Sequence, residues 1–237
     1  MAASDRQNMR VNSTVFVVVP AYNECRVIRA TMQPLIEMGY SVVVVDDAST
    51  DETTAVLRGL DLYILRHRIN RGAGAATQTG MSFALARGAS YIVHFDADGQ
   101  HRSQDIPVLL APLFAGRADV VLGSRFLRTA DRAAVPRARR LLLRGGVVFN
   151  GLLTGLWLTD AHNGLRAFTA QAAAQIDIRE NGFAHGSEIL QQIKRARLRC
   201  IEQPTMVSYT AYSMAKGQSP LNAIKIVFDL LLRRLFR

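Results

Sequence analysis

Short apolar runs alternate with longer, mixed segments along most of this chain. The runs are rich in valine, isoleucine and aromatic residues, which is typical of buried strands. The longer segments between them suit helices, and this alternation predicts an α/β fold with a mostly parallel central sheet. The expected strands are Val15–Val19, Val42–Val45, Leu62–Leu65, Tyr91–Phe95, Asp119–Leu122 and a strand near 200–207.

Helices are expected between the strands, where capping residues and glycines mark their ends. Ser49 and Glu52 have the spacing of a capping box, which predicts a helix that begins near Thr50. The other expected helices run from the loop at 20–24 to about Met38, from 70–74 to about Arg87, near Asp105–Phe114, over Leu141–Leu158, over about 170–176 and from about Ser187 to Arg197.

Functional side chains follow three of the expected strands. Pro20–Glu24 follows the first strand, Asp46 and Asp47 end the second, and Asp96-Ala97-Asp98-Gly99 ends the fourth. Ligands of open α/β sheets bind beyond the carboxyl ends of the strands. Two neighbouring carboxylates need a partner there, and a divalent cation supplies it by taking hard oxygen ligands. Gln100 offers a further oxygen, so the pattern indicates a metal site that clamps a diphosphate.

This acidic motif has three other possible interpretations. A solvated turn is the common one for two aspartates in a loop. A calcium loop of the EF-hand type needs glycine at its sixth position, whereas Gly99 is fourth from Asp96. An aspartyl-phosphate phosphatase uses its first aspartate as nucleophile, but its motif follows the first strand, and this one follows the fourth.

The charge and composition of the chain limit the classes of partner that it is expected to bind. The 237 residues suit one domain, and the net charge of +10 indicates an anionic partner: nucleic acid, a phosphorylated substrate or an anionic membrane surface. The segment 125–144 is rich in arginine. Cys25 and Cys200 are far apart, which favours reduced thiols. No signal peptide is evident, and the apolar stretch Gly145–Leu158 is too short to span a bilayer, so a cytoplasmic protein is expected.

Taken together, the motifs between Val15 and Ser219 resemble those of a known protein family. The chain resembles the family 2 glycosyltransferases of GT-A fold, and within them the dolichol- or polyprenyl-phosphate sugar synthases. The motifs are PAYNE (20–24), VDDASTD (45–51), NRGAGAA (70–76), DADGQH (96–101), GSRF (123–126), DAHNGLRAF (160–168) and the SEI around Glu188.

The resemblance implies the site residues. A UDP- or GDP-type sugar nucleotide would bind Pro20, Ala21, Tyr22, Glu24, Asp46, Asp47, Arg71, Gly72, Asp96 and Ala97. Mg²⁺ or Mn²⁺ would bind Asp96, Asp98 and Gln100, and the catalytic group would be Asp98, Arg125, Asp160 and Glu188. Structural interpretations stay open beside these. Asp46 could simply finish its strand, and Glu24 could complement a helix dipole. Gly72 and Gly74 could permit close helix–sheet packing, and Asp160 could brace the turn at 162–165 or Arg166.

The resemblance also implies an inverting transfer, and two acceptors are possible. A polyprenyl phosphate needs no general base, because its second pKa is about 6; it needs cations, and Arg125 and Lys216 are the candidates. A hydroxyl of a lipid-linked glycan or polysaccharide needs a base, for which Asp160 is the candidate. The family's arginine and lysine near the end of the domain are replaced here by Met214 and Pro220, which weakens the match to phosphate acceptors.

The expected organisation is a flexible tail (1–14), a catalytic domain (15–208), and an acceptor-side loop with an amphipathic C-terminal helix (209–237). That helix could pack on the core, or lie on the cytoplasmic face of an anionic membrane, or bind a small membrane protein. The non-enzyme alternative is a basic adaptor for membranes or nucleic acid with a degenerate site. The acids at three strand ends argue against it, and no nucleic acid partner is expected.

Overall fold

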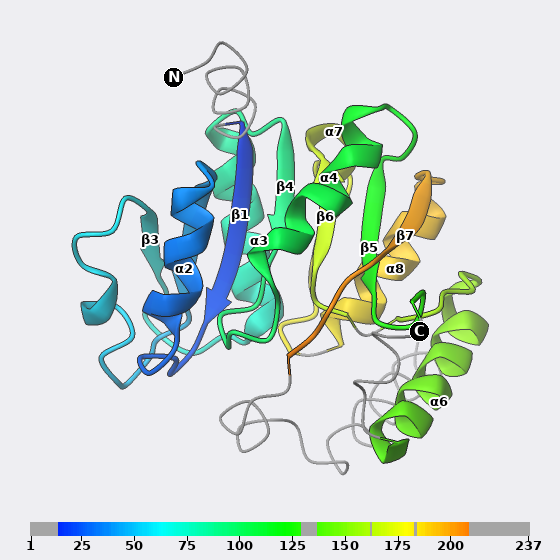
Figure 1. Cartoon of the computed structure of the whole chain (residues 1–237), viewed down its shortest axis with the longest axis horizontal. Coiled ribbons are helices and arrows are strands. Elements are labelled where there is room, and N and C mark those ends of the chain that lie inside the picture. The colour runs from blue at the N-terminus through cyan, green and yellow to red at the C-terminus, as the bar shows by residue number, and fades with distance from the viewer. Residues whose placement is uncertain (1–13, 129–136, 162, 183, 209–237) are drawn as a thin grey trace.

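A seven-stranded sheet forms the centre of the protein (Figure 1). The computed structural model describes residues 14–128, 137–161, 163–182 and 184–208. The strand order is β3-β2-β1-β4-β6-β5-β7, and all neighbours are parallel except the two pairs that β6 makes with β4 and β5. The expected mostly parallel sheet is confirmed. The strands are β1 (Val15–Ala21), β2 (Ser41–Asp46), β3 (Tyr63–Arg66), β4 (Tyr91–His94), β5 (Val120–Ser124), β6 (Arg166–Thr169) and β7 (Cys200–Pro204).

Strand β6 is absent from the sequence prediction. Its four residues begin with Arg166 and end with Thr169, so the apolar run is only two residues long. Its place comes from pairing instead, because β6 lies antiparallel between β4 and β5 with Arg166 opposite both His94 and Leu122. This insertion brings the loop before β6 against the end of β4.

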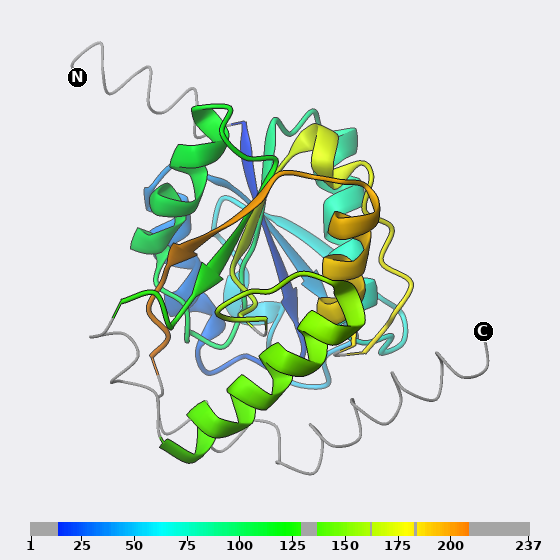
Figure 2. The ribbon, with the colours of Figure 1, turned by 90° about the vertical axis from the view of Figure 1, so that its right-hand side faces the viewer.

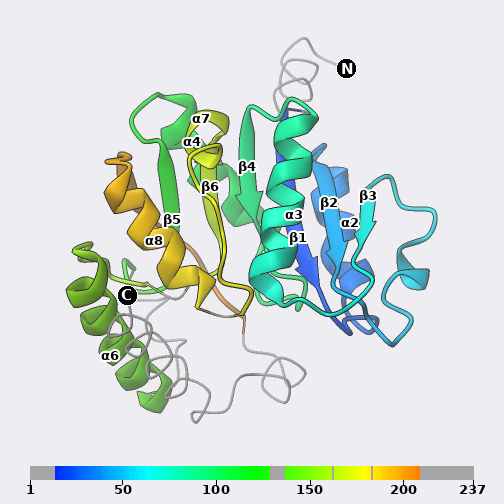
Figure 3. The same ribbon diagram turned by 180° about the vertical axis from the view of Figure 1, so that it is seen from behind.

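Helices cover both faces of the sheet. On one face lie α2 (Ile28–Glu37) and α4 (Ile106–Phe114), and on the other lie α3 (Ala73–Ala86), α7 (Ala170–Ala173) and α8 (His185–Arg195), which Figure 3 shows from behind. The strands are buried on both sides: Val17 packs toward the α2 face and Val18 toward the α3 face. Burial on both faces explains why β1 and β2 consist largely of consecutive valines. A further helix, α6 (Arg137–Thr154), packs against α8 and extends beyond the lower edge of the domain (Figure 2).

The predicted helix near Thr50 is wrong. Only a 3₁₀ turn forms, η1 (Ala55–Leu57). The Ser49 hydroxyl accepts a hydrogen bond from the backbone N–H of Asn23 instead of capping a helix of its own. The other expected helices are present with shifted ends; α6, for example, ends before Gly155, whose φ of 73° suits a helix stop.

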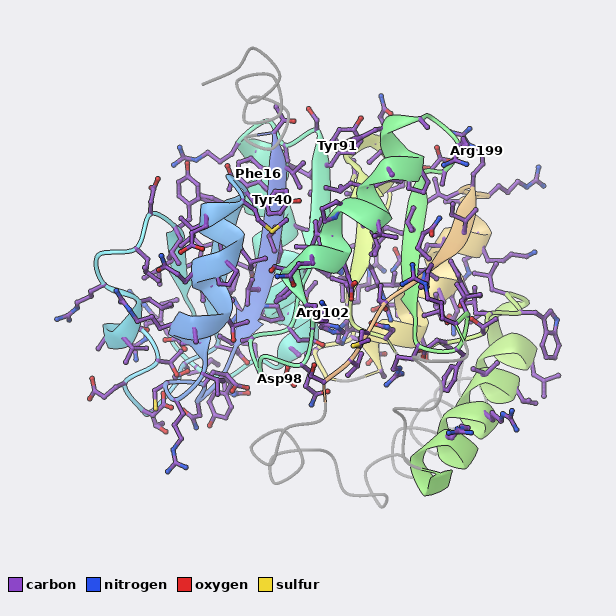
Figure 4. The ribbon with its side chains drawn as sticks, viewed as in Figure 1. Phe16, Tyr40, Tyr91, Asp98, Arg102 and Arg199 are labelled. Carbon is purple, nitrogen blue, oxygen red and sulfur yellow. The ribbon has the colours of Figure 1, made fainter. Side chains whose placement is uncertain are left out.

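The carboxyl ends of the parallel strands meet at one edge, which carries the acidic motif. In Figure 4, Asp98 lies at this edge and Tyr91, at the start of β4, lies at the opposite one. The chain returns to the same edge after β7, where Val207 bridges His101 and the Ser208 N–H donates to the carbonyl of Gln100. A second 3₁₀ turn, η2 (Ser103–Asp105), follows the motif.

Two features of the chain concern membranes. The predicted C-terminal helix and Lys216 lie outside the described residues. Within the residues that are described, no helix combines the length and the apolar character needed to cross a bilayer.

Candidate active site

The loops after β1 and β2 are interlocked. The Glu24 N–H donates to the Thr53 hydroxyl at 2.8 Å, and the Asp47 N–H donates to the carbonyl of Ala21 at 2.9 Å. Asn23 has a positive φ of 56°, which asparagine tolerates better than most residues. The structure thus places the predicted donor residues Pro20–Glu24 beside Asp46 and Asp47, with the Tyr22 ring exposed at the rim.

The two aspartates that follow β2 have different surroundings. Asp46 is buried and bonds inward, accepting from the Ser49 N–H and the Thr54 hydroxyl and pairing with Arg66. This environment favours the structural interpretation of Asp46 that the sequence left open.

Asp47 binds the start of α3. Its carboxylate accepts from His67, from the Arg71 N–H at 2.9 Å and from the Gly72 N–H at 2.6 Å. A carboxylate has about four acceptor sites, so three are in use. The amides expected near the nucleotide are therefore already bound to Asp47, and the side chain of Arg71 is exposed at the rim.

The glycines at the start of α3 allow another loop to approach. A Cβ on Gly72 would lie 2.3 Å from the carbonyl oxygen of Asn181, and one on Gly74 would lie 1.8 Å from that of Glu180. The Gly74 N–H also donates to Asn181 at 2.8 Å. These glycines permit close packing of α3 against the loop at 180–181, not the close packing of helix on sheet that was the alternative from the sequence.

Asp96 and Asp98 form the acidic centre of the edge. The Asp96 side chain is 46% exposed, and Ala97 between the two is buried. Burial and the charge of Asp96 raise the pKa of Asp98, and its carboxylate accepts from the Gln100 N–H at 2.9 Å. A cation would relieve this repulsion between like charges.

Asp96 and Asp98 can supply part of the ligand shell of a divalent metal. Across the described part of the chain, no three His, Cys, Asp or Glu side chains form a cage around one point. Mg²⁺ is commonly held by one or two carboxylates together with substrate phosphates. An exposed aspartate next to a second aspartate matches that pattern, with donor oxygens completing the shell.

Two residues outside the predicted donor, metal and catalytic sets, each within one of the motifs, hold Asp96 in place. His101, buried, donates from Nε2 to Asp96 at 2.8 Å. Gly164 lies against the same carboxylate, since a Cβ there would be 2.4 Å from Asp96 Oδ2. The surrounding protein would raise the pKa of Asp96, but the hydrogen bond from His101 and nearby positive charge lower it overall. The Gly99 turn that brings His101 back was visible in the sequence, whereas the contact with Gly164 depends on β6.

A buried group of basic residues lies behind Asp96 on the α3 face. Arg166 and His94 are cross-strand neighbours and both are about 5% exposed. Burial lowers the pKa of His94 to about 3, and the charges of Arg166 and His185 act in the same direction. His94 is therefore neutral at neutral pH and packs on the ring of Phe168.

Arg125 and Asp160, predicted for the acceptor and for proton transfer, are paired with each other. Nε of Arg125 lies 2.6 Å from Asp160 Oδ2, and Nη2 lies 2.8 Å from Oδ1, with both residues buried. Glu202 of β7 fixes the same turn by accepting from the N–H groups of Thr159 and Asp160. Asp160 thus braces a different arginine from the Arg166 considered in the sequence.

Glu188, in the first turn of α8, binds backbone. Its Oε2 accepts from the N–H groups of Arg179 and Glu180 at 3.0 and 2.9 Å. It therefore holds the loop whose carbonyls contact Gly72 and Gly74. The structure brings Asp47, the start of α3 and this loop together, and it does not leave Glu188 or Asp160 as an unbound carboxylate.

Comparisons with known proteins identify the family of this chain. The model of the family described as Glycosyl transferase family 2 matches residues 16–176. The chain belongs to glycosyl transferase family 2. A UDP-N-acetylglucosamine–dolichyl-phosphate N-acetylglucosaminyltransferase of Methanococcus voltae is 30% identical, covering 93% of this chain and 96% of that protein. An undecaprenyl-phosphate mannosyltransferase of Micrococcus luteus is 30% identical over 80% of this chain and 82% of its own length.

Solved structures show the same fold. Glucosyl-3-phosphoglycerate synthase from M. tuberculosis superposes with a TM-score of 0.70 at 18% identity, covering 99% of this chain and 85% of that one. A second structure of that enzyme, which contains Mn²⁺, UDP and glucosyl-3-phosphoglycerate, gives a TM-score of 0.67. The GT-A fold is thereby established, and this family 2 member is a glycosyltransferase.

Proposed function

We propose that this glycosyltransferase moves a sugar from a nucleoside diphosphate to a polyprenyl-phosphate lipid, with inversion and with Mg²⁺ or Mn²⁺. The Methanococcus and Micrococcus relatives, similar over most of their length, carry polyprenyl-phosphate acceptors in their names. The structural neighbour that contains Mn²⁺ and UDP supports a metal and a nucleotide donor.

The observation that carries the choice of acceptor is the bonded state of Asp160, the candidate base, and of Glu188. Asp160 is bound to Arg125 through both carboxylate oxygens, and Glu188 accepts from two backbone amides. A hydroxyl acceptor needs a base that can take its proton, and both acids are engaged in holding loops. A phosphate acceptor is largely ionised at neutral pH and attacks without that help.

The loops at the carboxyl ends of β1, β2 and β4 indicate how the sugar nucleotide would bind. Asp47 retains about one acceptor site for a base N–H or a ribose hydroxyl, and Tyr22 and Arg71 flank it at the rim. Asp96 and Asp98 would hold the metal, which when bound neutralises charge on the leaving diphosphate. His101 and Gly164 keep the Asp96 carboxylate in place, so the chain supplies a fixed negative charge just after the carboxyl end of β4.

The acceptor side is expected at the GSRF loop. Arg125 faces Asp160, so it would reach an acceptor phosphate only if that pair opened. We therefore assign Arg125 in the first place to shaping this loop, with Lys216 and the arginines of 128–139 as the remaining candidates for phosphate contact.

We further propose that α6 brings the domain to an anionic membrane. Val148, Leu152 and Trp157 are exposed, the last two by 70% and 68%, and the Trp157 ring packs on Gly151, where a Cβ would be 2.7 Å away. Arg144 continues the stripe at helical spacing. Exposed apolar side chains next to arginines suit the interface of an anionic bilayer. This surface would act together with the C-terminal helix predicted from the sequence.

The experiment that tests the proposal is calorimetric titration with UDP, GDP and their sugar conjugates, with and without Mn²⁺. Metal-dependent binding of one nucleotide is expected. An absence of binding to every nucleotide in the presence of Mn²⁺ would refute the enzyme assignment of this site.

A further inference from the structure

Arg166 is a buried cation that forms no ion pair with a carboxylate in the described part of the chain. Its guanidinium donates from Nε to the carbonyl of Asn163 at 3.2 Å and from Nη1 to that of Gly186 at 3.3 Å. Among the ion pairs within 4.0 Å in the described ranges, none includes Arg166. Burying a charged group without an opposite charge beside it costs free energy. The presence of Arg166 at this position therefore requires a physical explanation.

The charge that balances Arg166 is that of Asp96. Burial lowers the pKa of Arg166, and the negative charges of Asp96 and Asp160 act against that shift. Asp160 is already neutralised by its bidentate bond to Arg125. Within the described residues Asp96 pairs with no lysine or arginine, and its side-chain partner is His101, so Arg166 and Asp96 compensate each other through space.

Local structure fixes Arg166 behind the acidic centre. Its hydrogen bonds tie the loop that contains Gly164 to the first turn of α8, and Gly164 is the residue that contacts the Asp96 carboxylate. A Cβ on Gly186 would lie 3.2 Å from Arg166 Nη2, so the helix approaches the guanidinium closely. The guanidinium stays protonated at any working pH, and its charge is therefore a permanent property of the site.

A permanent positive charge here affects the two ligands in opposite ways. It repels a divalent cation that approaches Asp96 and Asp98, and it attracts a diphosphate. We propose that Arg166 sets the order of binding, so that the nucleotide's diphosphate enters before the metal or together with it, and free metal does not occupy the site first. This inference rests on the proposed function and concerns the same site. Arg166 acts through space as a positioning residue.

The size of the effect follows from Coulomb's law. At the effective dielectric constant of about 20 that suits protein sites, two unit charges about 10 Å apart change a binding constant by more than tenfold, and a divalent cation doubles the interaction energy. Removing the charge of Arg166 should therefore tighten binding of free Mn²⁺ and weaken binding of metal-free nucleotide, each by at least about tenfold.

The experiment measures both affinities in four proteins. Mn²⁺ alone is titrated by electron paramagnetic resonance, and UDP and GDP are titrated by calorimetry in EDTA. The proteins are the wild type, Arg166→Met, Arg166→Lys and Arg199→Met. Arg199, paired with Asp119, lies at the edge of the sheet opposite Asp98 (Figure 4), so its variant removes the same charge far from the site.

Opposite shifts in Arg166→Met, with wild-type affinities in Arg166→Lys and Arg199→Met, are expected. A merely structural role would weaken both ligands together, and that result, or no change in either, would overturn the inference. If Arg166→Met does not fold, Arg166→Gln replaces it, since glutamine can still donate to Asn163.

The wild type tests the order without any variant. A nucleotide should bind in EDTA at concentrations at which Mn²⁺ alone does not bind; tight binding of Mn²⁺ alone, with no nucleotide bound in EDTA, would contradict it. If neither nucleotide binds even with Mn²⁺, the proposed function fails, while the Mn²⁺ shift between variants still decides the role of Arg166.

Discussion

Replacing Asp160 by asparagine tests whether this acid is a brace or a base. In the wild type its carboxylate forms two charge-assisted hydrogen bonds with Arg125, at 2.6 and 2.8 Å, and both side chains are at least 94% buried. Asparagine keeps one acceptor oxygen and removes the counter-ion. Breaking a buried pair from one side costs about 3–5 kcal/mol, because an uncompensated charge stays inside. In a chain of this size each kcal/mol lowers Tm by about 2–4 °C, so a loss of roughly 10 °C is expected.

The assay is thermal and urea denaturation followed by circular dichroism, with transfer activity measured well below Tm. The control is Asp119→Asn, which breaks the same bidentate geometry in the exposed pair with Arg199 and should cost less than about 1 kcal/mol. Adding Arg125→Met to Asp160→Asn should restore part of the lost stability, because no cation is then left unpaired. Wild-type stability combined with a loss of activity by orders of magnitude would refute the bracing role and support a hydroxyl acceptor with Asp160 as base.

Three further predictions concern the metal corner and the membrane surface. Asp98→Ala should abolish transfer, while Tm without metal should hold or rise, because the raised pKa of Asp98 shows that its charge is disfavoured in the folded state; retention of most activity would contradict this role. Gly164→Ala should weaken Mn²⁺-dependent nucleotide binding at least tenfold by displacing the neighbouring carboxylate, whereas Gly145→Ala, with no atom within 4 Å of the new Cβ, should not. Leu152→Gln combined with Trp157→Gln should reduce flotation with anionic liposomes at low salt, and flotation equal to wild type would exclude α6 as the membrane surface.

Much of the fold was predictable because buried strands carry a strong local signal. Valine runs in β1 and β2 and the apolar run of β4 identify the sheet, and the acids that follow them identify its functional edge. The strand β6 was not predictable in this way, since Arg166 and Thr169 flank only two apolar residues and the strand is defined by its partners. The wrong helix near Thr50 has the same origin: Ser49 bonds to a loop 26 residues away, whose position local sequence does not specify.

The site was predictable as a set of residues more than as a set of contacts. The acids of the motif at 96–98 lie where the strand pattern indicates. The pairing of Arg125 with Asp160 spans 35 residues, and the sequence offered each of them a separate role. The contact of Gly164 with Asp96 was not predictable because it depends on the antiparallel insertion of β6, whereas His101 lies only five residues from Asp96, across the Gly99 turn. Both lie within motifs, but a motif does not specify which side chain each residue contacts.

The central claim is transfer of a sugar to a lipid phosphate. Its most direct test incubates the purified protein with a panel of UDP- and GDP-sugars, Mn²⁺, and either a polyprenyl phosphate or the matching polyprenol, and identifies products by mass spectrometry. We predict a sugar–phosphate–polyprenyl product from one nucleotide sugar, dependent on Mn²⁺ and absent with the polyprenol. Transfer to the polyprenol or to a glycan hydroxyl, with none to the phosphate, would contradict it.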